Sequence, residues 1–134
     1  MSHMTLEYSA NLRSDGDLQG LCTQLSRFMV DVRAEDKVVF PPGGVRVRAI
    51  CCEEFCIADG SLADAAFVHA ILKIGAGRSE PTKQAVIGGL FDIMKAHFAG
   101  LFASRGLALS LEFTEFSEAG TLKHNNLHAR FKKA

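Results

Sequence analysis

The stretch Phe67–Ser79, FVHAILKIGAGRS, predicts a strand, a sharp turn and the start of a helix in one continuous segment. Residues 67–74 place apolar side chains on alternating faces, which is typical of a strand in the interior of a sheet. The two glycines that follow allow the backbone to turn without a steric penalty. Ser79 is the expected N-cap of the helix. Arg78 is therefore expected at the mouth of a strand-to-helix turn.

A strand–helix–strand pattern occurs twice along the chain, and Gly60–Asp64 separates the two copies. Alternating apolar residues predict the strands, and apolar residues at helical spacing predict the helices. Gly106 is expected to end the second helix as its C′ residue. The expected elements are strand 4–9, helix 18–32, strand 45–52, strand 67–74, helix 80–104 and strand 107–113.

These elements predict one α+β domain over residues 1–134, built from a β-α-β unit at 4–56 and a second at 64–116. Two such units form a four-stranded sheet with both helices on one face, arranged either as in ferredoxins or as a pair of parallel units. The sequence leaves this choice open. The opposite sheet face needs a cover, and a partner subunit is the expected one. The tail at residues 117–134 is expected to dock on a neighbouring subunit.

The composition favours an ordinary cytoplasmic protein. The chain is 48% hydrophobic and carries 15 basic and 15 acidic residues, so no net charge favours nucleic acid or a membrane surface. We expect no nucleic-acid or membrane partner, because no apolar run has the length of a membrane span and no signal region precedes the first strand. The four cysteines are expected to be reduced thiols.

Several collinear segments resemble the 5-carboxymethyl-2-hydroxymuconate Δ-isomerases of the tautomerase superfamily. FVHAILKIGAGRS is the most specific of them. The others include FPPGGVRVR, SRGLALS and KHNNLHA, and together they cover nearly the whole chain. The matching positions are Glu7, Ser9, Asn11, 40–48, 58–60, 67–79, 95–98, 104–110 and 123–129.

The resemblance implies a tautomerase-like fold, a homotrimer and an isomerase that needs no metal or organic cofactor. It implies a small unsaturated polycarboxylate as substrate, in the homoprotocatechuate and 4-hydroxyphenylacetate pathway of aromatic compound catabolism. The family uses an amino-terminal proline as its base, and two arginines hold substrate carboxylates. Arg46 and Arg78 stand where those arginines are expected, and Ser2 stands at the position of the base.

Ser2 is the main departure from the family pattern, and three interpretations remain open. The letters S-H-M resemble a cloning remnant that replaced native residues. Alternatively the serine is natural and supplies a primary amine once Met1 is removed. In the third interpretation the protein has lost the activity. A retained Met1 would place the Ser2 nitrogen in an amide, which has no basic lone pair.

The chemistry of these groups agrees with proton transfer. An α-amine titrates at about 7.7–8.0, so it both accepts and returns a proton at cellular pH. Arginine stays charged and grips a carboxylate with two parallel hydrogen bonds. From spacing alone, exposed or intersubunit ion pairs are the favoured role for Arg46 and Arg78, and the family resemblance favours substrate binding instead. Arg48 is expected to be structural.

The cysteines and the remaining histidines are expected to have structural roles or are left without a role. Adjacent Cys51 and Cys52 point to opposite faces of a strand, and no second ligand pair follows them, so buried thiols are favoured over a metal site. His69 is expected to be an interior or interface histidine. No role is assigned to the other three late histidines, His97, His124 and His128.

Two further functions remain alternatives to the isomerase. One is a catalytically impaired binding or assembly protein on the same scaffold, which Ser2 and a retained Met1 suggest. The other is a promiscuous tautomerase that acts on simple keto acids.

Overall fold

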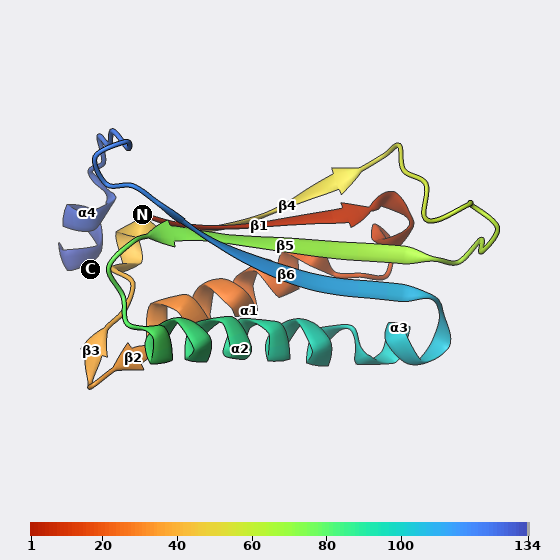
Figure 1. Cartoon of the computed structure of the whole chain (residues 1–134), viewed down its shortest axis with the longest axis horizontal. Helices are drawn as coiled ribbons and strands as arrows, with labels where there is room; N and C mark the ends of the chain where they lie inside the picture. Colours follow the sequence, from red (N-terminus) through yellow and green to blue (C-terminus); the bar gives the residue numbers. More distant parts are fainter. Residues whose placement is uncertain (134) are drawn as a thin grey trace.

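Each predicted strand–helix–strand unit forms in the structure, a computed structural model that describes residues 1–133 (Figure 1). The first unit comprises β1 (Ser2–Ser9), α1 (Leu18–Asp31) and β4 (Val45–Cys52). The second comprises β5 (Ala66–Gly75), α2 (Glu80–His97), α3 (Ala99–Ser104) and β6 (Leu107–Phe116). The tail ends in α4 (Leu127–Lys133), and Ala134, the last residue of the predicted docking tail, lies outside the described residues.

The four long strands form one sheet in the order β4-β1-β5-β6. Within each unit the two strands are parallel, β1 with β4 and β5 with β6. The two units meet through β1 and β5, which run antiparallel. The sheet is therefore a pair of parallel units rather than a ferredoxin-like layout, which settles the choice that the sequence left open.

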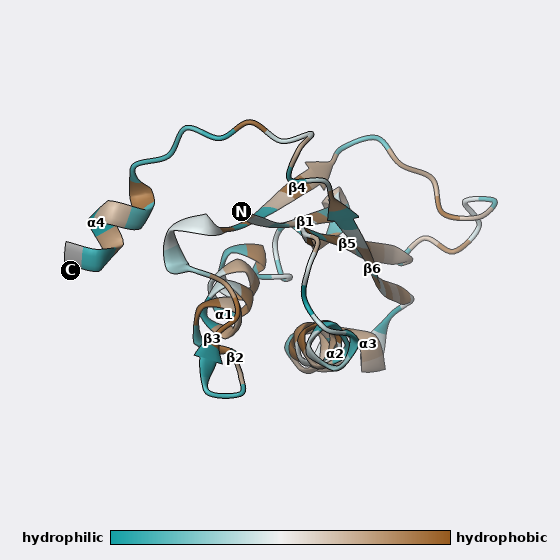
Figure 2. Cartoon of the chain, turned by 60° about the vertical axis from the view of Figure 1, so that its left-hand side comes forward, coloured by the Kyte–Doolittle hydropathy of each residue, from teal (hydrophilic) through white to brown (hydrophobic). Residues whose placement is uncertain are grey.

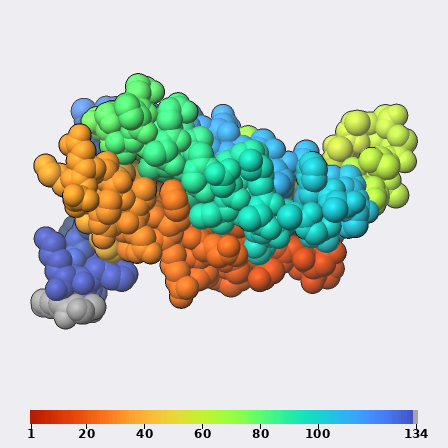
Figure 3. All heavy atoms as spheres, turned by 90° about the horizontal axis from the view of Figure 1, so that it is seen from below, coloured from red at the N-terminus to blue at the C-terminus, as the bar shows by residue number. Residues whose placement is uncertain are grey.

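Both long helices cover the same face of the sheet. Seen from the helix side, α1 and α2 lie next to each other across the sheet (Figure 3). The alternation predicted for β5 is confirmed, because the side chains that face the helices are buried. On β5 these are Val68, Ala70, Leu72 and Ile74, and from β1 Met4 and Leu6 join them. The opposite face keeps polar and partly exposed residues.

The helix starts follow from local hydrogen bonds. Ser79 accepts a hydrogen bond from the backbone N–H of Thr82, which confirms its predicted role as N-cap of α2. Asp17 caps α1 in the same way, by accepting from the N–H of Gly20. Arg78 thus lies immediately before a capped helix, as the sequence predicted.

The predicted helix at 80–104 is wrong as one continuous element. It is interrupted at Phe98, whose backbone angles of −98° and 9° leave the helical range between α2 and α3. The Phe98 ring is buried in the core, with 1% exposed, which holds the backbone in this bend. Apolar spacing continues across the bend, so the sequence pattern did not reveal it.

Gly106 occupies the predicted C′ position, directly after Arg105, the C-cap of α3, but it lacks the positive φ of a left-handed helix cap. Its carbonyl instead accepts from the N–H of Ala66, 2.9 Å away, at the start of the β5–β6 pairing. A Cβ at Gly106 would lie 3.1 Å from Leu62, so the missing side chain permits a close approach of two segments.

Three strands are longer than predicted, since pairing continues beyond the alternating stretches, and β5 extends by one residue at each end, to Ala66 and Gly75. β1 begins at Ser2, where it pairs with both neighbours, and β6 runs to Phe116 beside Gly75. A short ribbon of β2 (Arg33–Ala34) and β3 (Lys37–Val38) was not predicted. Its turn residues Glu35 and Asp36 both have positive φ, which is the backbone of a tight hairpin turn.

The tail after β6 leaves the sheet and reaches α4, which stands to one side of the body in Figure 2. α4 contacts the short helical turn η2 (Pro42–Gly44) of the same chain. Among the helices formed by residues 1–133, none combines the length and the apolar character needed to cross a membrane.

Candidate active site

The topology brings four separate parts of the chain to one end of the sheet. β1 and β4 are parallel and both begin there, whereas β5 runs the other way and ends there. Figure 1 shows the N-terminus, the end of β5 and the C-terminal segment at this end. Arg46 at the start of β4 and Arg78 just after β5 are therefore at the same end as the chain's α-amine.

Arg78 is fixed by the backbone around it. Its guanidinium donates hydrogen bonds to the carbonyls of Gly75, at 2.9 Å, and Val39, at 3.1 Å. The guanidinium carbon also lies 4.8 Å from the centroid of the Phe40 ring, in cation–π contact. Burial lowers the pKa of Arg78, and the nearby Glu118 opposes this. Arg78 remains a cation, since even a lowered arginine pKa lies far above neutrality.

Arg46 lies on the sheet face opposite the helices, in register with His3 of β1. One guanidinium nitrogen, Nη1, is buried and has no hydrogen-bond partner within residues 1–133. Such a nitrogen is costly to bury unless a ligand or neighbour satisfies it. Arg48, two residues further along, donates to Nδ1 of His3 at 3.1 Å, which agrees with the structural role predicted for it.

The α-amine belongs to Met1, and the nitrogen of Ser2 is part of a peptide bond. Ser2 is buried, with 2% exposed, and is paired with Val45 and Ile74 toward the helix side of the sheet. Burial lowers the pKa of the Met1 amine, and the cations Lys123, Arg78 and Arg46 lower it further, while Glu118 raises it.

Glu118 and Lys123 join the site from the tail, and sequence reasoning did not single them out. They form an ion pair of 2.8 Å between Nζ and Oε2. This hydrogen bond lowers the pKa of Glu118, and the α-amine and Arg78 contribute. Lys123 does stand in the KHNNLHA segment that carried the family resemblance. The four positive groups are called the cationic cluster below: the α-amine, Arg46, Arg78 and Lys123.

Both His97, to which the sequence assigned no role, and His69 have structural contacts. Nε2 of His97 donates to the carbonyl of Gly16 at 2.8 Å, which ties the end of α2 to the segment before α1. His69 lies between Ser110, at 2.6 Å from Nδ1, and Glu112, at 3.1 Å from Nε2, on the sheet face away from the helices. Neither histidine belongs to the cationic cluster.

The cysteines are free thiols, and Cys22 is buried, which raises its pKa. The sequence expected the strand cysteines to be buried as well, but Cys51 and Cys52 are only partly buried and Cys56 is exposed, because they lie at and beyond the end of edge strand β4. The Sγ of Cys51 accepts from Arg13 at 3.1 Å. In the part of the chain that the structure describes, no three His, Cys, Asp or Glu side chains are grouped as metal ligands.

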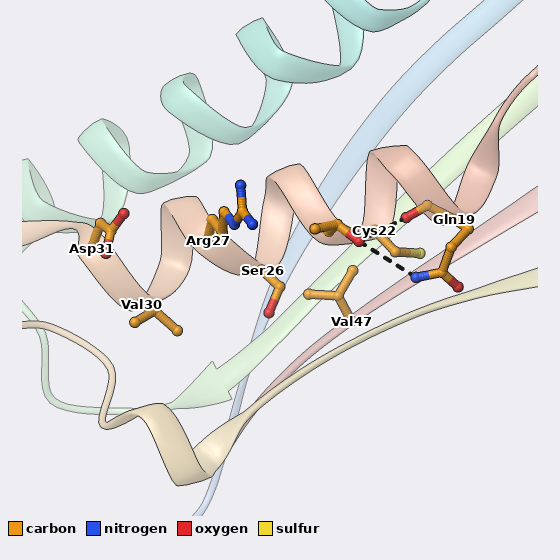
Figure 4. A pocket seen from close by; sticks show the side chains of 8 residues that line it. Gln19, Cys22, Ser26, Arg27, Val30, Asp31 and Val47 are labelled. Atoms are coloured by element: carbon orange, nitrogen blue, oxygen red, sulfur yellow. Dashed lines mark hydrogen bonds between the residues drawn. The ribbon is translucent and has the colours of Figure 1, made fainter. Parts of the chain in front are cut away.

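Two hollows flank edge strand β4. One, of about 320 Å³, lies next to the cationic cluster on the open sheet face and is lined by His3, Thr5, Arg48, Ile71 and Lys73. The other, of about 360 Å³, lies between α1 and Val47 of β4 (Figure 4). Gln19, Cys22 and Arg27 line this second hollow, and none of its side chains belongs to the cationic cluster.

Known proteins match the chain over nearly its full length. A curated 5-carboxymethyl-2-hydroxymuconate Delta-isomerase of Escherichia coli is 40% identical over 132 residues, which is 98% of this chain and 100% of that protein. The crystal structure of a 5-carboxymethyl-2-hydroxymuconate isomerase from Deinococcus radiodurans R1 is 46% identical, covers 97% of this chain and 93% of its own, and has a TM-score of 0.88.

A second crystal structure, of a 5-carboxymethyl-2-hydroxymuconate delta-isomerase, is 32% identical and has a TM-score of 0.90, over 100% of this chain and 95% of its own. These matches confirm the predicted fold. The sequence profile of 5-carboxymethyl-2-hydroxymuconate isomerases matches residues 2–131. The chain therefore belongs to the 5-carboxymethyl-2-hydroxymuconate isomerase family.

Proposed function

We propose that the chain is a 5-carboxymethyl-2-hydroxymuconate Δ-isomerase of homoprotocatechuate and 4-hydroxyphenylacetate breakdown. The observation that carries the proposal is the membership of this family, with a 40% identical isomerase of Escherichia coli along nearly the whole chain. The cationic cluster supports it, because a substrate with several carboxylates needs several positive groups. The reaction is expected to take place in the cytoplasm.

The reaction is a proton transfer along a dienol. The 2-hydroxyl of the substrate loses its proton, its oxygen becomes the keto oxygen, and the far carbon of the conjugated chain, C5, gains a proton. The double bonds shift accordingly, and no electrons enter or leave, so the chemistry itself requires no redox cofactor. A neutral amine is a suitable base and its protonated form a suitable acid.

Arg46 and Arg78 are proposed to bind the two carboxylates of the muconate and to stabilise the dienolate that forms during transfer. Arg78 is supported by its fixed position, and Arg46 by a buried nitrogen that no group within residues 1–133 satisfies. In the family the base is an amino-terminal proline at the position of Ser2. Here the proposed base is the α-amine at the start of β1, which Met1 carries in this structure and Ser2 carries once Met1 is removed.

A homotrimer remains our proposal for the assembly. The sheet face away from the helices carries partly exposed apolar residues such as Ile71 and Ile50, and Leu122 and Phe131 of the tail are exposed. A subunit that covers these residues would remove apolar surface from water. Light scattering after size exclusion tests the assembly, and a mass of one or two chains would contradict it.

An ultraviolet assay on 5-carboxymethyl-2-hydroxymuconate tests the function. The chain is compared with a variant that begins with proline, in which Met1 is absent and Ser2 is replaced, and intact mass verifies each first residue. We expect the proline variant to turn over the muconate faster than the chain that keeps Met1. Folded variants that are both inert would contradict the isomerase. Faster turnover of phenylpyruvate would favour a tautomerase of simple keto acids instead.

A further inference from the structure

The segment after β6 brings Lys123 to the candidate site, and two contacts fix its course. Glu118 lies against Gly75 at the end of β5, since a Cβ added to this glycine would be 2.5 Å from Oε1 of Glu118. Asn125 donates from Nδ2 to the carbonyl of Gly43, 3.3 Å away, just before β4. Lys123 is therefore held between an anchor at the end of β5 and an anchor at the start of β4.

The cationic cluster carries more positive charge than the acid beside it neutralises. Three cations, Lys123, Arg78 and Arg46, lower the pKa of the α-amine, and one anion, Glu118, raises it. A second acid nearby, Glu115, is already paired with Lys83 at 3.2 Å. The surplus of positive charge suits a ligand with more than one carboxylate, and the buried Nη1 of Arg46 lacks an acceptor within residues 1–133.

We propose that Lys123 is a specificity residue that binds the third carboxylate of the substrate, the one on its carboxymethyl arm. This inference rests on the proposed function. The two muconate carboxylates terminate a rigid conjugated chain and suit two guanidinium groups on fixed elements. The carboxymethyl group rotates about a single bond. The ammonium group of a lysine, on a flexible side chain, can follow this rotation better than a guanidinium group on a fixed element.

The ion pair with Glu118 positions Lys123 for this role. Glu118 holds Nζ at 2.8 Å, and the side chain of Lys123 is still 37% exposed, so it is reachable from solvent. An incoming carboxylate takes the place of Glu118 as the partner of Lys123, so the exchange costs little free energy. Of the charged side chains, Lys123 also has the largest effect on the α-amine, which agrees with a position beside the proposed base.

Substrate selectivity tests the proposal. The ratio of kcat/KM for 5-carboxymethyl-2-hydroxymuconate to that for 2-hydroxymuconate, which lacks the carboxymethyl arm, is measured with one common N-terminal residue. Lys123→Gln is expected to lower this ratio about tenfold or more, since it removes one charged hydrogen bond. Lys95→Gln, which removes an exposed ion pair with Asp92 on α2, is the control and is expected to keep the ratio. An unchanged ratio in Lys123→Gln would overturn the proposal.

A second variant separates recognition from a role in holding the tail. Glu118→Gln breaks the same ion pair as Lys123→Gln but leaves the lysine available. If the pair only fixes the tail, both variants lower the ratio together, and that outcome would refute the specificity role. If Lys123 binds the carboxylate, the ratio in Glu118→Gln stays or rises.

Calorimetric titration with tricarballylate and with glutarate provides a readout that needs no turnover. Lys123→Gln is expected to reduce the preference for the tricarboxylate by about tenfold. If this preference falls while no form of the chain isomerises the muconate, the proposed function fails and the role of Lys123 stands. If turnover is normal and Lys123→Gln changes neither the kcat/KM ratio nor the preference for tricarballylate, the role of Lys123 fails and the proposed function stands.

Discussion

Arg46 and Arg78 both lower the pKa of the α-amine of Met1, yet the fold provides hydrogen-bond acceptors for the two guanidinium groups unequally. Arg78 donates to the carbonyls of Gly75 and Val39, whereas Nη1 of Arg46 is buried without a partner within residues 1–133. Arg78 is thus part of the framework, and Arg46 has a buried donor to offer a ligand. The two arginines should respond differently to replacement.

Arg46→Met is expected to lower kcat/KM about 100-fold or more, because the proposed substrate loses charged hydrogen bonds worth about 3 kcal/mol. The free energy of unfolding is expected to stay or to rise by about 1 kcal/mol, since the variant no longer buries an unsatisfied nitrogen. Kinetics and urea denaturation measure the two effects. Arg48→Met on the same strand is the control for charge loss, and a marked loss of stability in Arg46→Met would contradict this account.

Arg78→Met is expected to lower both activity and stability. Two backbone carbonyls lose their donor, and the cation–π contact with Phe40 is lost, so the free energy of unfolding should fall by about 1–3 kcal/mol. Arg78→Lys should recover part of the activity and part of the stability, since an ammonium group keeps the charge but lacks the planar, two-pronged hydrogen-bonding geometry of a guanidinium group. Urea denaturation beside steady-state kinetics tests this. Equal stability of wild type and Arg78→Met would show that the carbonyls find other donors.

The sequence predicted Arg78 in its turn because the determinants are local. An alternating strand, two glycines and a serine N-cap are adjacent in the chain. The strand and the N-cap are confirmed, and Gly77 has the positive φ of a turn, whereas Gly75 still belongs to β5. The bend at Phe98 escaped prediction because it depends on the burial of one ring against the rest of the core. Apolar spacing alone does not distinguish a continuous helix from a bent one.

The tail side of the site was not predictable in the same way. Glu118 lies against Gly75, and Asn125 donates to the carbonyl of Gly43, so the position of Lys123 between them follows from the path of the whole segment. The expectation that Ser2 supplies the amine once Met1 is removed stays a prediction.

The pH dependence of kcat/KM should follow the lowered pKa of the α-amine. A base must be neutral, so activity is expected to rise with pH through a pKa below the usual range of about 7.7–8.0. Glu118→Gln removes a charge that raises this pKa and should shift the rise to lower pH. Lys123→Gln removes a charge that lowers it and should shift the rise to higher pH. Shifts of the same sign in both variants would contradict the assignment of the amine.

Neighbouring glycines of α2 provide a matched test of the helix packing that supports the site. An added Cβ at Gly89 would clash with the ring of Phe28 on α1, whereas one at Gly88 would meet nothing within 4 Å. Gly88→Ala should therefore raise the free energy of unfolding by about 0.5–1 kcal/mol, because alanine is the better helix former. Gly89→Ala should lower it by about 1–3 kcal/mol, since the two helices must move apart. Urea denaturation measures both, and a stabilised Gly89→Ala would show that the Phe28 ring turns aside at little cost.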